Sequence, residues 1–175
     1  MKEAKTQFRE GEVKRPTLLG IFPGHVIDLK IGNFINESVP FNFLIKFASE
    51  CSDIDAKNAD GETVKAESMV GKVLMSVGAW FSETPKRESD NSRYVRFCEA
   101  CGVEFEERDD AKLIGEVEKI DVLGAPVLAV VRYVVDSRDK EKSLEERRMY
   151  ARVVHLQRWE EGEPLSLEEL DLVPF

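Results

Sequence analysis

Strict alternation of apolar and polar residues marks two segments in the first third of the chain. Residues 25–31, HVIDLKI, predict a half-buried strand whose inner face is formed by His25, Ile27, Leu29 and Ile31. Residues 41–47, FNFLIKF, predict a second strand with an inner face of Phe41, Phe43, Ile45 and Phe47. Both patterns have a period of two, which a helix does not produce.

The next two segments contain turn residues. Residues 51–65 are polar and include Asp60-Gly61, so they predict a long loop or a mobile hairpin. Residues 69–81, MVGKVLMSVGAWF, predict a long strand with Lys72, Ser76 and Trp80 on one face. Gly71 and Gly78 inside this strand are typical of a bulge or a strong bend.

A helix is predicted within residues 89–102, where apolar residues recur with helical spacing. Its buried stripe consists of Tyr94, Phe97, Cys98 and Cys101. Ser89 or Asp90 can cap its start, and Gly102 stands where a left-handed residue ends a helix. A shorter helix is expected within residues 109–120.

Two more strands follow, at residues 125–135 and 147–159. The connection at 136–147 is predicted to be a hairpin with a helical turn, although Ser143 and Glu146 have the spacing of a helix capping box. Five strands with one helix after the third indicate a mainly β fold. This pattern is typical of a five-stranded antiparallel barrel of the OB-fold kind with an inserted α-helix.

The charge of the chain is unevenly distributed. The 175 residues carry a formal net charge of −9, with 34 acidic and 25 basic side chains. Six of the acidic ones follow Trp159, and no basic residue does. We therefore divide the chain into a polar N-terminal arm (1–16), an OB-fold-like core (17–159) and an acidic C-terminal tail (160–175). Such a tail is either an interaction segment or a solvated terminus.

The chain has no segment with the length of a membrane span and no signal-peptide pattern. Its three cysteines fit a reducing compartment, so we expect a cytoplasmic protein without a membrane partner. Cys98 and Cys101 have C-x-x-C spacing, but only Cys51, His25 and His155 remain to complete a zinc site, and both cysteines also continue the helical stripe. We expect core packing, with a metal or thiol function as the alternative.

Catalytic motifs are absent from the sequence. No nucleophile lies next to a base, and no glycine-rich phosphate loop occurs. We therefore expect a protein that is not an enzyme and that uses no cofactor.

Aromatic and basic residues alternate on the predicted strands. Single-stranded nucleic acid is held by rings that stack on bases and by cations that contact phosphates. The candidate stacking residues are Trp80, Tyr133, Tyr150 and Trp159. The candidate phosphate contacts are Lys46, Lys72, Arg132, Arg148, Arg152 and Arg158. The alternative is that these residues cover a barrel edge through cross-strand ion pairs.

The last eight residues, EELDLVPF, form an acidic segment with an apolar tip. Such a tip suits a receptor with an apolar pocket and a basic rim. The candidate partner-binding residues are Glu168, Glu169, Asp171, Leu172, Val173, Pro174 and Phe175. The same tail could instead occupy the protein's own cationic groove and compete with nucleic acid.

This tip resembles that of bacterial single-stranded DNA-binding proteins at Asp171, Pro174 and Phe175. The body resembles phage-encoded single-stranded DNA-binding proteins of OB fold. The likeness lies in FPGHVIDLKIGNF, in RYVRFCEACGVEF, and in DVLGAPVLAVVRYV followed by ARVVHLQRW. The resemblance implies protection of single-stranded DNA in replication and recombination, with replication and repair proteins docking on the tail. The rival hypothesis is an acidic interaction module that mimics DNA and inhibits a host DNA-binding protein. The sequence favours neither a monomer nor a homo-oligomer.

Overall fold

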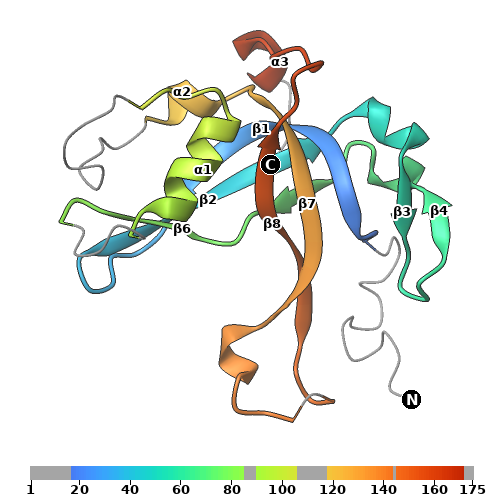
Figure 1. Cartoon of the computed structure of the whole chain (residues 1–175), viewed down its shortest axis with the longest axis horizontal. Helices are drawn as coiled ribbons and strands as arrows, with labels where there is room; N and C mark the ends of the chain where they lie inside the picture. The colour runs from blue at the N-terminus through green and yellow to red at the C-terminus, as the bar shows by residue number, and fades with distance from the viewer. Residues whose placement is uncertain (1–16, 85–89, 106–117, 144, 172–175) are drawn as a thin grey trace.

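The computed structural model describes residues 17–84, 90–105, 118–143 and 145–171, and they form a mainly β structure (Figure 1). Its strands are β1 (Gly20–Ile31), β2 (Ser38–Phe47), β3 (Asp55–Lys57), β4 (Thr63–Lys65), β5 (Val73–Met75), β6 (Ala79–Ser82), β7 (Pro126–Val135) and β8 (Met149–Arg158). Its helices are α1 (Ser92–Ala100), α2 (Lys119–Val122) and α3 (Leu167–Asp171). Short 3-10 turns occupy Ser49–Asp53, Ala66–Met69 and Ser137–Asp139.

One antiparallel sheet organises the molecule. Its strand order is β5-β2-β1-β7-β8, and β6 pairs with β2 beside β5. Strands β3 and β4 form a separate hairpin. Among the described residues, the outer strands meet at one parallel bridge, where the Val77 N–H donates to the Val153 carbonyl at 2.9 Å. The predicted mainly β class is therefore confirmed, while the pairing does not continue around the sheet as a closed barrel.

The aromatic residues of β2 form the centre of the core. Val39, Phe41, Phe43, Ile45 and Phe47 are all buried, as their alternation predicts. Full burial of each such side chain contributes roughly 1.5–3 kcal/mol. Helix α1 covers this face, and its two inner rings meet those of β2, with Phe97 5.5 Å from Phe43 and Tyr94 5.2 Å from Phe41 between centroids.

Strand β1 departs from the predicted alternation. Its pairing with β2 shifts between Val26 and Asp28, so Ile27 is an extra residue in a bulge. The bulge reverses the faces, since Val26 is fully buried and Ile31 is 59% exposed. The predicted inner face therefore holds for Ile27 and Leu29, which are buried, and fails at Ile31.

The predicted long strand at 69–81 is also wrong, because it is divided into β5 and β6. The break falls at Ser76, whose hydroxyl accepts from the Phe43 N–H at 2.9 Å and whose side chain is buried. Lys72 precedes β5 in a turn, where its carbonyl accepts from the Phe47 N–H. Lys72, Ser76 and Trp80 consequently do not share one face.

The predicted helix is confirmed, with a different start. Tyr94, Phe97 and Cys98 are buried, and Gly102 follows the helix at φ 92°. Asn91 precedes the first helical residue, and its side chain makes no cap and instead bonds the backbone of β6. Asp90 therefore is not the cap, and Ser89 lies outside the described residues.

The cysteines lie in or beside the core, as predicted. Cys51 and Cys98 are buried and Cys101 is partly buried, and all three are free thiols. Burial raises the pKa of the Cys51 thiol to about 11 and that of Cys98 to about 12. Because the thiolate is the reactive form, these thiols are poor nucleophiles. Within the described part of the chain, no three potential ligands are grouped to hold a metal ion.

The predicted hairpins are present. Residues 51–65 contain the β3–β4 hairpin, and the Asp60-Gly61 turn joins its strands. Residues 136–147 connect β7 to β8 and include a 3-10 turn, as expected. The predicted helix at 109–120 lies mostly outside the described residues, with α2 at its end.

None of the helices in the described ranges has the length and hydropathy of a membrane span.

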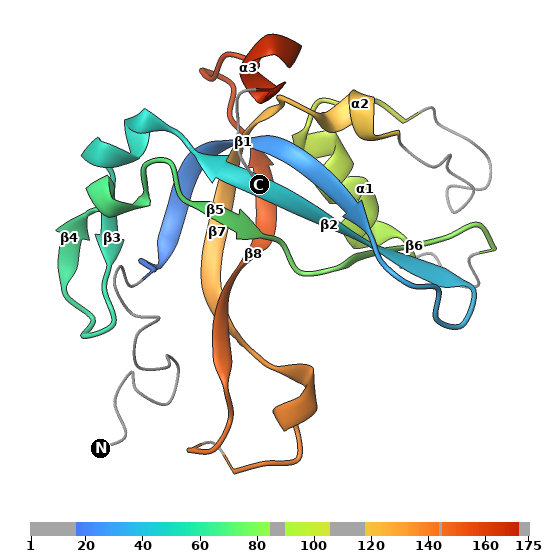
Figure 2. The same cartoon turned by 180° about the vertical axis from the view of Figure 1, so that it is seen from behind.

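Two parts of the structure project from opposite ends of the body. The β7–β8 hairpin extends beyond the sheet as an arm, defined here as residues 132–152, and α3 lies at the other end (Figures 1 and 2). Both views show the same separation, which decides what each part can contact.

Candidate nucleic-acid interface

The outer face of the arm carries two arginines opposite each other. Arg132 of β7 pairs in register with Arg152 of β8, and Val134 pairs with Tyr150. Directly opposed side chains in an antiparallel pair have Cβ atoms about 4.5–5.5 Å apart, so like charges there repel. Among the described residues, neither arginine forms an ion pair with a carboxylate. An anion bound between them would relieve this repulsion.

Tyr150 lies under one of these cations. The Arg152 guanidinium carbon is 5.4 Å from the centroid of the Tyr150 ring, within the range of a cation–π contact. The guanidinium also donates to the Ala151 carbonyl at 3.0 Å. The structure thus brings together three of the predicted residues, Arg132, Tyr150 and Arg152, on one face.

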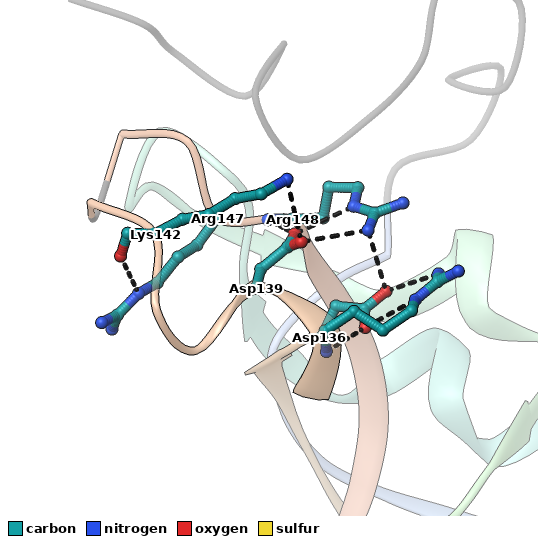
Figure 3. A network of polar contacts seen from close by, with 6 residues as sticks. Asp136, Asp139, Lys142, Arg147 and Arg148 are labelled. Carbon is teal, nitrogen blue, oxygen red and sulfur yellow. Dashed lines mark hydrogen bonds and ion pairs between the residues drawn. The ribbon is translucent and has the colours of Figure 1, made fainter.

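Arg148 has a structural partner within the arm (Figure 3). Its Nε and Nη2 donate to the two oxygens of Asp139 at 2.9 and 3.0 Å, and its backbone N–H donates to the same carboxylate at 2.7 Å. Lys142 adds a further contact to Asp139 at 3.2 Å. The structure therefore places Arg148 in a hairpin ion pair, and its predicted phosphate contact stays a prediction.

These contacts favour the charged form of each acidic group. The Arg148 guanidinium holds the pKa of Asp139, whose side chain is fully buried, well below its usual range. Hydrogen bonds from Arg138 lower the pKa of Asp136 to about 2. Arg147 binds the carbonyls of Lys140 and Lys142 instead of a carboxylate. The tip of the arm is thus fixed by its own side chains.

Tyr133 and Lys72 both contact Thr17, on the other side of the arm. The Tyr133 hydroxyl donates to the Thr17 carbonyl at 3.3 Å, and Lys72 Nζ donates to the Thr17 hydroxyl at 3.4 Å. Burial raises the pKa of Tyr133. Strand alternation places Tyr133 on the face opposite Arg132. The structure therefore does not bring the candidate stacking residue Tyr133 together with Arg132 and Arg152.

Lys46 is also distant from the arginine pair. It pairs with His25 of β1, which pairs in turn with Pro126 of β7. Arg132 lies six residues further along β7, about 20 Å at the rise of a strand. Lys46 therefore does not belong to the face that carries Arg132 and Arg152.

Arg158 and Trp159 lie at the opposite end of β8. Arg158 pairs with Val127, and its guanidinium approaches Gly102 at the end of α1. The Trp159 ring packs against His25, with 5.5 Å between ring centroids, and against Gly162. Trp159 is thus an internal contact between β8 and the following segment, and the structure does not bring it together with Arg132 and Arg152.

Trp80 stands on β6 with its ring 41% exposed. It borders a cleft of about 770 Å³ between α1, β6, β8 and the β1–β2 turn. The basic residues that line this cleft are Arg93, Arg96 and His155, and the acidic ones are Glu37 and Asp90. The strand patterns in the sequence did not identify the two arginines. Their spacing of three on the polar face of α1 is the signal that could have identified them.

The β1–β2 turn presents apolar side chains that were also missed. Ile31, Phe34 and Ile35 are 59%, 71% and 57% exposed. Gly32 and Asn36 flank Phe34 and Ile35, which marks these two residues as part of a turn rather than a core strand. Of these residues, Ile35 also lines the cleft that Trp80 borders.

The segment after Trp159 is packed against the body as far as α3. His25 Nε2 lies 2.8 Å from the Glu163 carbonyl, and the Leu165 N–H donates to the Gly124 carbonyl at 2.9 Å. Gly124 has φ 81°, and a Cβ there would lie 2.5 Å from the Leu165 carbonyl oxygen, so only glycine fits. Leu170 is buried.

A capping box formed by Ser166 and Glu169 precedes α3. The Ser166 N–H donates to Glu169 Oε2 at 2.8 Å, and the Glu169 N–H donates to Ser166 Oγ at 3.2 Å. Glu168 is exposed. Leu172, Val173, Pro174 and Phe175 lie outside the described residues.

Comparisons with protein-family models, with curated proteins and with solved structures gave no significant match for this chain.

Proposed function

We propose that this protein binds single-stranded DNA without sequence preference along the outer face of its arm, and that its C-terminal segment recruits replication and repair proteins. We also propose that the fold is a variant of the OB fold. Three features support this: the strand order β5-β2-β1-β7-β8, the position of α1 between β6 and β7 in the chain, and the parallel bridge between Ser76 and Val153.

The opposed arginines carry the functional proposal. A fold that needed only a stable hairpin would place opposite charges across β7 and β8, because Arg132 facing Arg152 costs stability. A phosphate backbone supplies the missing negative charge. Tyr150 provides a ring beside the same cations, and stacking on it requires no particular base.

The position of α3 bears on how the C-terminal segment could recruit a partner while the arm binds DNA. Residues 160–170 are held at the end of the molecule opposite the arm, so they do not cover Arg132 and Arg152 (Figure 1). Competition between this segment and DNA is therefore not part of the proposal. A partner bound at the C-terminal segment would leave the arm accessible.

The test is a titration of labelled oligo-dT at several salt concentrations with the wild type and with Arg132→Gln/Arg152→Gln. For single strands the logarithm of affinity falls with the logarithm of salt by about 0.7 per phosphate contact. We expect the double variant to bind more weakly at low salt and to lose about 1.4 from this slope.

The matched control is Lys30→Gln/Lys57→Gln, which removes the same charge from β1 and β3. We expect it to retain the wild-type slope. Equal affinity and slope for the wild type and the arginine variant would contradict the proposed interface. An absence of binding by every form at low salt would instead favour the acidic DNA-mimic function.

A further inference from the structure

The cleft beside Trp80 has the size of a ligand site. Its volume of about 770 Å³ falls within the range of about 300–1,000 Å³ that is typical of small-molecule pockets. Four separate parts of the chain form its walls, namely α1, β6, β8 and the β1–β2 turn. It lies beyond the arm, so the proposed interface does not include it.

The lining combines an open aromatic ring with unpaired cations. Within the described residues, Trp80 makes no ring contact. Arg93 and Arg96 are exposed on one side of α1 and have no carboxylate partner there. With the described residues, Arg93 makes a 3.4 Å contact to the Gly78 carbonyl and Arg96 a 3.4 Å contact to Ser92 Oγ. A ring for a base and two guanidinium groups for a phosphate are the parts of a nucleotide site.

The acidic side chains of the cleft fit the same ligand. Glu37 lines it and accepts from Thr84 Oγ1 at 3.3 Å, so its carboxylate has capacity for another donor. Carboxylates accept from the exocyclic amino group of cytosine. Thymine has no such group, so the lining favours cytosine over thymine.

Side-chain hydrogen bonds and unusual backbone conformations shape the walls of the cleft. Asn91 Oδ1 accepts from the Ser82 N–H at 2.8 Å, and Asn91 Nδ2 donates to the Ser82 carbonyl at 3.0 Å, which ties the start of α1 to β6. The non-glycine residues with positive φ in the described ranges are Asn36, Glu37 and Asn91, and all three line the cleft. Unfavourable backbone conformations concentrate at functional sites.

Strand β8 connects the cleft to the arm. Val154 and His155 line the cleft, and Arg152 precedes His155 by three residues, about 10 Å along a strand. We infer that the cleft binds one nucleotide of the strand held by the arm, with its base on Trp80 and its phosphate at Arg93 and Arg96. This inference rests on the proposed function, and free mononucleotides share the same chemistry.

The experiment follows the two indole N–H resonances of the protein in ¹⁵N correlation spectra during titration with free dCMP, dTMP and deoxycytidine. Trp80→Phe assigns the resonances. We expect the Trp80 resonance to shift saturably with dCMP, at about 5-fold or more lower concentration than with dTMP or deoxycytidine. In Arg93→Gln/Arg96→Gln, the advantage of dCMP over deoxycytidine should disappear.

The arm variants separate this inference from the proposed function. If dCMP leaves the Trp80 resonance unchanged while oligonucleotide binding depends on Arg132 and Arg152, the cleft inference is wrong and the arm proposal stands. If dCMP binds but the arm variants bind oligonucleotides normally, the cleft binds free nucleotides and the arm proposal fails. Equal binding of oligo-dC by wild type and Trp80→Ala, which removes the ring, would exclude a strand nucleotide as the occupant.

Discussion

Glu37 occupies a backbone position that favours glycine. Asn36 and Glu37 have φ 49° and 68°, and Ile35 and Ser38 exchange two backbone hydrogen bonds around them. This is the geometry of a two-residue type I′ turn, for which Asn-Gly is the preferred sequence. The carboxylate of Glu37 is therefore placed in the cleft at a cost in backbone energy.

We expect Glu37→Gly to raise the free energy of unfolding by roughly 0.5–1 kcal/mol, because glycine adopts positive φ without strain. Urea denaturation of the two proteins measures this difference. Glu37→Gln is the control, since it removes the charge and keeps the strain, and it should not stabilise. A less stable glycine variant would show that the Thr84 contact outweighs the strain.

The arginines of the arm show which site residues a sequence can identify. Alternation alone places Arg148, Tyr150 and Arg152 on one face. It does not show that Asp139, nine residues earlier, folds back onto Arg148 and leaves Arg152 without a carboxylate. The exposed cations of the site therefore depend on the path of a hairpin loop, which the local pattern does not encode.

At the scale of elements, the arm depends on buried charge at its tip. Asp136 and Asp139 have lowered pKa values in the folded protein, so their contribution to stability is complete above the ordinary aspartate pKa of about 4 and is lost as the pH falls toward 2. We expect the amides of residues 137–148 to lose protection in this range before those of β2. Hydrogen exchange followed by mass spectrometry measures both regions.

Asp139→Asn tests the same contacts at neutral pH. It removes the charge that Arg148 and Lys142 share, so trypsin should cleave the arm at Lys140, Lys142 and Arg147 faster than in the wild type. Asp60→Asn, at an exposed hairpin turn, is the matched control and should not change cleavage. An unchanged rate in Asp139→Asn would show that backbone pairing alone holds the tip.

The elements predicted well are those set by local patterns. The phenylalanines of β2 and the stripe of α1 each depend on residues within a few positions of one another. The predicted inner face of β1 holds at Ile27 and Leu29 but misses the buried Val26, because the bulge at Ile27 depends on pairing with β2 on one side and β7 on the other. The division between β5 and β6 depends on Ser76 reaching Phe43, a contact across 33 residues.

At the scale of the whole molecule, the C-terminal segment is part of the fold up to Leu170. A chain that ends at Trp159 loses the contacts of Glu163, Leu165 and Leu170 with the body. We expect this truncation to lower the free energy of unfolding by roughly 2–4 kcal/mol, from the loss of buried apolar surface. Thermal unfolding of this form and of one that ends at Asp171 measures the effect.

The form that ends at Asp171 is the control, and it should retain the wild-type stability and oligo-dT affinity. If the shorter form were equally stable, the α3 contacts would be energetically unimportant. The form that ends at Trp159 should be less stable, whereas the form that ends at Asp171 should stay folded. Comparing the two forms therefore separates loss of folding from loss of partner binding.

The separation of α3 from the arm has a consequence for assemblies. In an array of copies bound through their arms to one strand, every α3 would face away from the DNA (Figure 2). The coated strand would then display its C-terminal segments as a repeated ligand. A partner with two receptor pockets could engage neighbouring copies at once, and the second contact would form at the high effective concentration set by their spacing. Weak single contacts would thus select long coated strands over isolated molecules.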